Sequence, residues 1–436
     1  MDTQIKELEK QEFNKRDKEL CLIASENYCS EDVLNASGSI FQCKYSEGFP
    51  NKRYYQGCEV VDKMENECIN ACLELFNAKE EYYANVQPNS GASANMIVYN
   101  AILKAGDKVL SMDTMAGGHI SHGHPKSYLA KYHTVETYGV DDNGLLDYDA
   151  IEQQAIKFSP KLIVCGASNY SRIIDFKRFK EIADKVGAYL MCDIAHISAL
   201  VAHGLHPSPV GIADFITFTT HKMLAGPRGG VIIYKQDYDK EIKLSTIPSL
   251  FGGPLEQQIY AKLVCFKEQL NNGKTVAKNI IKNAKVMAET FTKYNVPLVS
   301  GGTDNHLMTV DLTDYSVTGK QMAEILEECG IIVNCNTVPN DKRSFLETSG
   351  IRIGVPAVTT RGLTQQDIKT LTRYISNLIN ACKEDYESDF DLLDKFEKAH
   401  DNLKWHVFDL IMNYPLKDFY PKMYNELFET KELSWV

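Results

Sequence analysis

Two short runs of β-branched and aromatic residues, separated by a polar stretch, stand out along the chain. They cover Phe215–Thr219 and Gly230–Tyr234, and the segment between them contains Lys222 and a Gly/Pro-rich turn around Arg228. β-rich runs bounded by glycine and proline are typical of strands. We therefore predict strand, loop, strand, with Lys222 on a loop that two strands support.

A second region alternates strand and helix patterns. Lys161–Ser168 is apolar and strand-like, Asp175–Val186 has apolar residues at helical spacing, and Ala188–Asp193 is again strand-like. This β, α, β order predicts a parallel sheet with a right-handed crossover. The polar residues at the ends of these strands should share the edge where open α/β sheets bind ligands: Ser168, Asp193 and His196.

Small residues mark two further candidate sites. Ser90, Gly91 and Ala92 precede an apolar helix, and the free N–H groups at a helix N-terminus bind phosphate. The same turn could also be a plain N-cap. The predicted strand Val109–Asp113 leads into a glycine-rich loop with His119, which could stack on a ring or simply be solvated.

The length of 436 residues and the elements predicted in the rest of the chain indicate an arm and two domains. We expect a charged helical arm at 1–24, a large domain at 25–295 and a smaller domain at 296–436. The other predicted elements are helices at Val60–Phe76, Leu255–Asn295 and Gly319–Cys329, a helix capped by Thr364 and Asp367, strands at His306–Leu312 and Ile331–Val333, surface helices from Glu384 to Val436, and a surface loop at Lys79–Tyr82.

Composition is that of a soluble globular protein from a reducing compartment. The net charge of −11, with no run of Lys or Arg, gives no support to nucleic-acid binding. No apolar run is long enough to span a bilayer and the charged start does not resemble a signal sequence, so we expect a cytoplasmic location. The twelve cysteines form no CxxC pair, which argues against a metal site and a disulfide scaffold.

Taken together, the predicted loop lysine, helix end and strand-end carboxylate are the parts needed to hold pyridoxal phosphate. Desolvation between strands would lower the pKa of Lys222 and let it bond to the cofactor aldehyde, whereas an exposed loop lysine is the alternative. Asp193 would keep the pyridine nitrogen protonated, and His119 would cover the ring. Arg352 could clamp a substrate carboxylate. These residues predict an amino-acid enzyme of this cofactor class without defining its reaction.

Six motifs, in order from about residue 20 to at least 380, resemble the serine hydroxymethyltransferase family. They are Leu22–Asn27, Lys44–Gly48, Lys52–Tyr55, Asn85–Pro88, Thr219–Gly230 and Gly302–Leu307. The resemblance implies an α/β, aspartate aminotransferase-like fold of type I, with a mostly parallel sheet in the large domain. It also implies reversible transfer of the hydroxymethyl carbon of L-serine to tetrahydrofolate, giving glycine and 5,10-methylenetetrahydrofolate.

The resemblance also assigns a role to each candidate site residue. Lys222 would bond the cofactor, Glu47 would act as acid/base near the serine hydroxyl, and the catalytic set would be completed by His119, Asp193 and Thr219. The cofactor-binding residues implied are Ser90, Gly91, Ala92, His119, Ser168, Asp193, His196, Lys222, Tyr45, Gly252 and Gly253. Those for the substrate are Ser25, Glu47, Tyr55, Arg228 and Arg352, and those for folate are Tyr54, Ile120 and Asn336.

A homodimer with shared active sites, alone or paired into a tetramer, is implied as well. In the family, the loop bearing Tyr45, Glu47 and Tyr55 and the loop bearing Gly252 and Gly253 serve the neighbouring subunit. Five positions depart from the family pattern around the cofactor, carboxylate and folate sites: Ala92, Thr114, Met223, Cys335 and Val355. At position 92 the missing serine hydroxyl removes one hydrogen bond to phosphate, worth about 1 kcal/mol.

Two alternative functions are compatible with parts of this pattern, and they differ in the need for folate and in the presence of activity. A folate-independent enzyme of the same fold, such as a threonine aldolase, would cleave a β-hydroxy amino acid without tetrahydrofolate and without Glu47. A degenerate relative kept for binding or assembly would lack activity, an idea motivated by the substitutions around the cofactor. The presence of the full catalytic set argues against the second reading.

Overall fold

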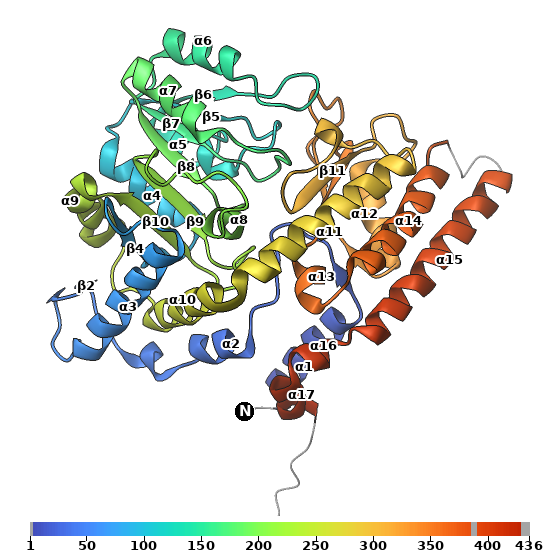
Figure 1. Cartoon of the computed structure of the whole chain (residues 1–436), viewed down its shortest axis with the longest axis horizontal. Coiled ribbons are helices and arrows are strands. Elements are labelled where there is room, and N and C mark those ends of the chain that lie inside the picture. The colour runs from blue at the N-terminus through green and yellow to red at the C-terminus, as the bar shows by residue number, and fades with distance from the viewer. Residues whose placement is uncertain (1–2, 385–389, 429–436) are drawn as a thin grey trace, which may run out of the picture.

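The computed structural model describes residues 3–384 and 390–428, and its centre is a seven-stranded sheet (Figure 1). The strand order is β4, β10, β9, β8, β7, β5, β6, with bounds Tyr82–Asn85 (β4), Gly230–Lys235 (β10), Phe215–Thr219 (β9), Tyr189–Asp193 (β8), Leu162–Cys165 (β7), Lys108–Met112 (β5) and Thr134–Tyr138 (β6). β9, β8, β7, β5 and β6 are parallel, and β10 is antiparallel to both of its neighbours. The predicted α/β fold with a mostly parallel sheet is confirmed.

Successive side chains of each strand point to opposite faces of the sheet, and an apolar layer covers each face. In β7, Leu162 and Val164 join the layer beneath α4 (Gly91–Ile102), whereas Ile163 and Cys165 join the larger layer on the other face. Helices that contribute to the larger layer include α2 (Glu31–Ser37), α3 (Glu59–Leu75), α6 (Tyr148–Phe158), α7 (Phe176–Val186) and α8 (Ser198–Ala202). Two short helices, α5 (Tyr128–Tyr132) and α9 (Asp239–Leu244), contribute to the α4 layer. Because both faces are covered, the central strands β7, β8 and β9 are buried along almost their whole length.

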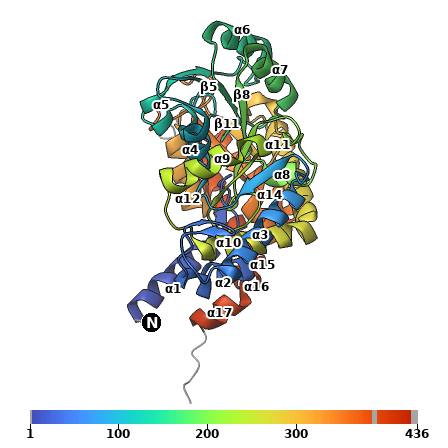
Figure 2. The same cartoon turned by 90° about the vertical axis from the view of Figure 1, so that its left-hand side faces the viewer.

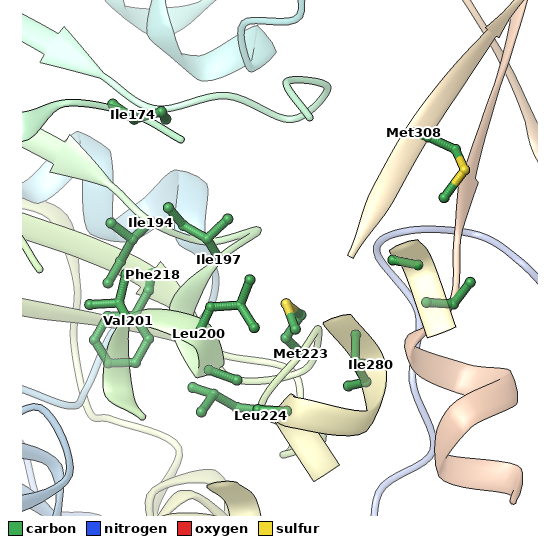
Figure 3. Packing of buried hydrophobic residues seen from close by; sticks show 14 of the residues in the cluster. Ile174, Ile194, Ile197, Leu200, Val201, Phe218, Met223, Leu224, Ile280 and Met308 are labelled. Carbon is green, nitrogen blue, oxygen red and sulfur yellow. The ribbon is translucent and has the colours of Figure 1, made fainter. Parts of the chain in front are cut away.

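The larger layer extends from the sheet to the C-terminal part of the chain. Figure 3 follows it from Phe218 of β9 through Leu200 of α8 and Met223 to Ile280 and Met308. Met223 directly follows Lys222, so the loop that carries this lysine is anchored in the core rather than lying on the surface.

A long helical segment leads from the sheet into the C-terminal part (Figure 1). α10 (Glu256–Glu268) continues through π-helical turns at Gln269–Gly273 into α11 (Lys274–Lys293), close to the predicted span. α11 packs against α13 (Pro356–Arg361) and α14 (Gln365–Ala381). One helical segment therefore contacts both parts of the molecule.

The C-terminal part contains a three-stranded antiparallel sheet with the order β11 (Leu307–Asp311), β14 (Gly350–Gly354) and β13 (Asn334–Asn336). Its helices include α12 (Gly319–Glu328) and α15 (Phe390–Asn413). The N-terminal arm lies against this part, because β1 (Leu20–Cys21) pairs in parallel with β12 (Ile331–Ile332). In addition, α1 (Thr3–Asp17) packs on α16 (Leu416–Phe419) and α17 (Pro421–Phe428), and Figure 2 shows these three helices at the same end of the molecule.

The predicted helices at Val60–Phe76, Gly319–Cys329 and after Thr364 are confirmed to within a residue or two, including the capping box of Thr364 and Asp367. The surface loop expected at Lys79–Tyr82 ends one residue early, because Tyr82 is buried as the first residue of β4, a strand that local pattern did not predict. Within the predicted C-terminal helices, residues 385–389 and 429–436 lie outside the described residues. Among the described residues, no helix combines the length and apolarity needed to cross a membrane.

Candidate active site

A cavity of about 390 Å³ opens where the carboxyl ends of β7, β8 and β9 meet the N-terminus of α4 and strand β14. It brings together most of the candidate site residues: Ser25, Ser90, Gly91, Ala92, His119, Ser168, Asp193, His196, Thr219, Lys222, Arg228 and Arg352. These residues come from both parts of the chain, since Ser25 and Arg352 lie near the C-terminal sheet and the others near the large one. His122 and His221 line the same cavity and were not singled out from the sequence.

Lys222 lies on the loop after β9 and is only 8% exposed. Burial, reinforced by the positive charges of Arg352 and Arg228 and opposed by Asp193, lowers its pKa to about 8. Thr220 shapes the loop by donating through Oγ1 to the carbonyl of Pro227 (2.6 Å) and accepting at its own carbonyl from the amide of Gly226 (2.8 Å). The alternative of an exposed loop lysine is therefore wrong, and a substantial fraction of Lys222 is an uncharged, nucleophilic amine near pH 8.

Asp193, at the end of β8, is held as a carboxylate by three donors. His122 Nε2 and Asn95 Nδ2 both donate to its Oδ2 at 2.8 Å, and the amide of Ala195 donates to Oδ1 at 3.0 Å. Burial raises the pKa of Asp193, but these bonds and the nearby histidines outweigh burial, so the pKa lies well below its ordinary value. Thr217 fixes Asn95 in turn by donating to Asn95 Oδ1 (2.6 Å).

The N-terminus of α4 forms one end of the cavity. Ser90 is its N-cap and forms a reciprocal capping box with Ser93, so the plain N-cap reading is correct for the Ser90 side chain. The amides of Gly91 and Ala92, in the first turn, have no intrahelical acceptor and remain able to bind an anion. The close approach requires glycine at position 91, because a Cβ there would lie 2.7 Å from Thr219 Cγ2.

Two cavity histidines are uncharged at neutral pH. Burial and the neighbouring His122 lower the pKa of His119 to about 4. His196 is fully buried and its pKa is lowered well below the usual value, chiefly by desolvation. Its ring stacks on that of His306 with 5.6 Å between centroids, and its Nδ1 has no hydrogen-bond partner among the residues described. A buried, unpartnered nitrogen in a cavity wall is the signature of a polar group that binds there.

Arg352, on β14, reaches across to the large sheet. Its Nη1 donates to the carbonyl of Ser168 (2.8 Å) and its Nε to Asn334 Oδ1 (3.1 Å), and it has no ion pair with a carboxylate in the described part of the chain. Burial lowers its pKa to about 10, so it stays charged. Gly354 on the same strand packs on Ala24, where a Cβ would come within 2.3 Å of the Cα, and this contact brings Ser25 to the cavity. A buried guanidinium without a counter-ion is suited to bind a carboxylate.

The other candidate residues lie outside this cavity. Ile120 is exposed beside His119, and Asn336 is on β13. Tyr45, Glu47, Tyr54 and Tyr55 belong to the loop around the hairpin β2 (Gly48–Phe49) and β3 (Lys52–Arg53), and the Gly252–Gly253 turn packs on this loop, with a Cβ at Gly253 only 3.0 Å from the Tyr45 ring. We call residues 44–57 with this turn the hairpin surface. Its three tyrosines are exposed.

The hairpin surface is exposed but well ordered by hydrogen bonds. Arg53 donates through Nη1 to the carbonyls of Ser46 and Gly48 (2.9 Å each) and pairs with Asp62 and Glu65 of α3. Gln87 donates to Glu65 Oε1 (2.8 Å) and to the carbonyl of Gly48 (3.0 Å). This network holds the loop in a fixed shape at a distance from its own chain's cavity.

Sequence reasoning missed the partners of Asp193. His122 follows His119 by one turn of the same glycine-rich loop, which was a usable signal, whereas Asn95 lies inside an apolar helix and gave none. The residues of the cavity fit pyridoxal phosphate: an amine that deprotonates near pH 8, a stable carboxylate, free helix-end amides and an unpartnered imidazole nitrogen. Fold and site together define a pyridoxal-phosphate-dependent enzyme of fold type I.

Comparison with known proteins identifies the family. The model of the family "Serine hydroxymethyltransferase" matches residues 1–375. A curated serine hydroxymethyltransferase from Coprothermobacter proteolyticus is 48% identical over 416 residues, which is 95% of this chain and 96% of that protein. The chain therefore belongs to the serine hydroxymethyltransferase family and is a pyridoxal-phosphate-dependent glycine hydroxymethyltransferase, a one-carbon transferase.

Proposed function

We propose that the protein interconverts L-serine and glycine with tetrahydrofolate as the one-carbon acceptor, in active sites that two subunits share. The observation that carries the proposal is the convergence, in one cavity, of a lysine with a pKa of about 8, a stable carboxylate and a buried guanidinium without a counter-ion. When bound, pyridoxal phosphate supplies an electron sink for charge that develops at the substrate α-carbon.

Each cavity residue has a separate task. Lys222 would supply the amine to which the cofactor aldehyde bonds, and Asp193, as a carboxylate, would accept the N–H of the pyridine ring. The first turn of α4, through Gly91 and Ala92, would bind the phosphate, and His119 would cover the ring. Thr219 packs beside Gly91, and Ser168 and His196, which also line the cavity, would contact the ring oxygen of the cofactor.

The substrate is bound by its carboxylate. Arg352 keeps its charge when buried and, with Ser25, receives the carboxylate and so fixes the orientation of the bond that breaks. Arg228 adds a second positive charge to the cavity wall. Because Arg352 is already oriented by the Ser168 carbonyl and Asn334, little rearrangement accompanies binding.

The hairpin surface supplies the remaining groups to the cavity of a second subunit. Glu47 acts as acid/base at the serine hydroxyl, Tyr55 contacts the substrate, and Tyr45, Gly252 and Gly253 contact the phosphate. Three facts support a shared site: these residues lie outside their own cavity, the tyrosines are exposed, and Arg53 donates hydrogen bonds to two carbonyls of the loop. The protein is then a homodimer, alone or as half of a tetramer.

Tetrahydrofolate would lie between Tyr54 of one subunit and Ile120 and Asn336 of the other. The exposed side chains of Tyr54 and Ile120 provide apolar surface for its rings. Thr114 and Cys335, which depart from the family pattern, lie in the segments next to these residues and set the affinity for folate. Met223 and Val355 are buried in the core and act on the site only through packing.

We further propose that the chain works in the cytoplasm and divides into an arm (1–24), a large domain (25–295) and a small domain (296–436). The twelve cysteines, each unpaired, suit a reducing compartment.

The decisive test measures folate dependence. Protein loaded with pyridoxal phosphate should convert labelled serine to glycine rapidly only when tetrahydrofolate is present, with label recovered in methylenetetrahydrofolate. Lys222→Ala is the control. Equal rates of glycine formation with and without tetrahydrofolate would contradict the proposal and would indicate a folate-independent aldolase.

A further inference from the structure

A second buried lysine lies behind the cavity and takes no part in the chemistry described above. Lys262, on α10, is 1% exposed. Its Nζ donates to three main-chain carbonyls, those of Val86 (2.6 Å), Pro88 (3.0 Å) and Gly230 (3.0 Å). It forms no ion pair with any carboxylate in the residues that the structure describes.

The number of acceptors indicates the protonated form. An ammonium has three N–H donors and no lone pair, so it matches three carbonyls, whereas a neutral amine would direct a lone pair at one of them. Burial lowers the pKa of Lys262 to about 8, with nearby groups including Glu65 opposing the shift, so the ammonium predominates at neutral pH. A buried charge without a counter-ion is costly, and its full complement of carbonyl acceptors offsets that cost.

The three carbonyls belong to two segments next to residues that line the cavity, namely Ser90 at the start of α4 and Arg228. Val86 and Pro88 lead into the Ser90 cap of α4, and Gly230 follows the turn that carries Arg228. The two segments are in close contact, because the amide of Gly230 donates to the Pro88 carbonyl (2.9 Å) and a Cβ at Gly230 would lie 2.1 Å from the Ser90 carbonyl oxygen.

We propose that Lys262 is a positioning residue that fixes the first turn of α4 relative to the Gly229–Gly230 turn, and so sets the spacing that receives the phosphate of pyridoxal phosphate. This inference rests on the proposed function for the place of the phosphate, at Gly91 and Ala92. Lys262 does not touch the reacting atoms, so its loss acts on phosphate binding and leaves the amine of Lys222 intact.

The test compares two aldehydes that differ only in the phosphate. Apoprotein is titrated with pyridoxal phosphate and with pyridoxal, and the adduct at Lys222 is verified by borohydride reduction and peptide mass. Lys262→Met should weaken pyridoxal phosphate binding by about tenfold or more, the loss expected when one or two hydrogen bonds to a charged group are weakened. Pyridoxal binding should change by less than about twofold. Lys262→Gln, which keeps two donors, should fall between Lys262→Met and the wild type.

Two further variants make the result specific. Lys267→Met changes an exposed lysine on the same helix and should leave both affinities unchanged. Gly229→Ala would place a Cβ 2.3 Å from Lys262 Cε, displacing the side chain without removing it, and should give the same phosphate-selective loss. If Lys262→Met does not fold, Gly229→Ala serves as the test, and the result is its loss of affinity for pyridoxal phosphate compared with its loss of affinity for pyridoxal.

Equal loss for both aldehydes, or no loss for either, would overturn the role assigned to Lys262. Failure of the proposed function would look different, because the wild type itself would then carry no adduct at Lys222 or bind both aldehydes with the same affinity.

Discussion

The wall of the cavity and the hairpin surface are built in opposite ways. The cavity wall is buried, rests on the carboxyl ends of central strands and has its charged groups desolvated, as in Lys222 and Arg352. The hairpin surface is exposed, lies on a short two-stranded hairpin, and is held from behind by Arg53 and Glu65. The first encloses the candidate active site, whereas the second presents its tyrosines to solvent.

The difference shows how much of an active site one chain can complete. Desolvation lowers the pKa of Lys222 and of Arg352, and the buried cavity provides that environment within a single subunit. Glu47 and the tyrosines of the hairpin surface need a fixed shape more than burial, and the Arg53 network supplies it. An exposed but ordered surface of this kind is suited to enter a neighbour's cavity, and the following predictions test that division.

The largest effect is expected from Lys222→Ala. Loss of the only amine proposed to bond the cofactor should reduce serine turnover by at least about 10⁴-fold, the usual scale for a nucleophile. Borohydride reduction followed by peptide mass mapping should find no adduct. Thermal unfolding should change little, since Lys222 has no ion pair among the described residues. An intact adduct on another lysine, with normal turnover, would contradict the assignment.

Glu47→Gln should have the next largest effect. An amide of the same shape cannot transfer the proton at the serine hydroxyl, so turnover should fall about 10²- to 10⁴-fold. Attachment of the cofactor to Lys222 should be unchanged, because that step uses only the cavity wall. Steady-state kinetics and adduct mass, measured on one preparation, separate the two effects. Unchanged turnover would remove Glu47 from the mechanism.

A mixed dimer sharpens the comparison further. Lys222→Ala and Glu47→Gln subunits carrying different tags are co-expressed, and the heterodimer is isolated by both tags. If sites are shared, one of its two cavities has both groups, and activity should recover to about half that of the wild-type dimer. Heterodimers as inactive as either parent would show that each cavity uses its own chain's Glu47.

The smallest effect concerns pH. Because the pKa of Lys222 is lowered to about 8, the nucleophilic amine gains population as pH rises, so the rate of adduct formation by apoprotein should increase and level off above about pH 8. Arg352→Gln removes a positive charge that lowers this pKa, and the midpoint should move upward. Stopped-flow absorbance measures both. A rate that falls as pH rises would contradict a lysine nucleophile.

Much of the cavity could be predicted because local patterns determine it. Phe215–Thr219 and the following loop, the βαβ unit and the Ser90 cap follow from periodicity and capping rules, and strand ends gather side chains at one edge. Three features have no local signal. β4 is a short edge strand, Asn95 reaches Asp193 from a helix interior, and nothing in the sequence distinguishes Lys262 from the other residues of α10. Their roles depend on contacts between distant segments, which spacing along the chain does not encode.

The pairing of β1 with β12 has a consequence for how the chain is made. Leu20 and Cys21 are synthesised long before their strand partners, Ile331 and Ile332. During synthesis the arm, and with it Ser25, has no strand to join until most of the polypeptide has emerged, and such late, long-range closure slows folding. The cavity around Ser25 can therefore form only after β12 has been synthesised and has paired with β1.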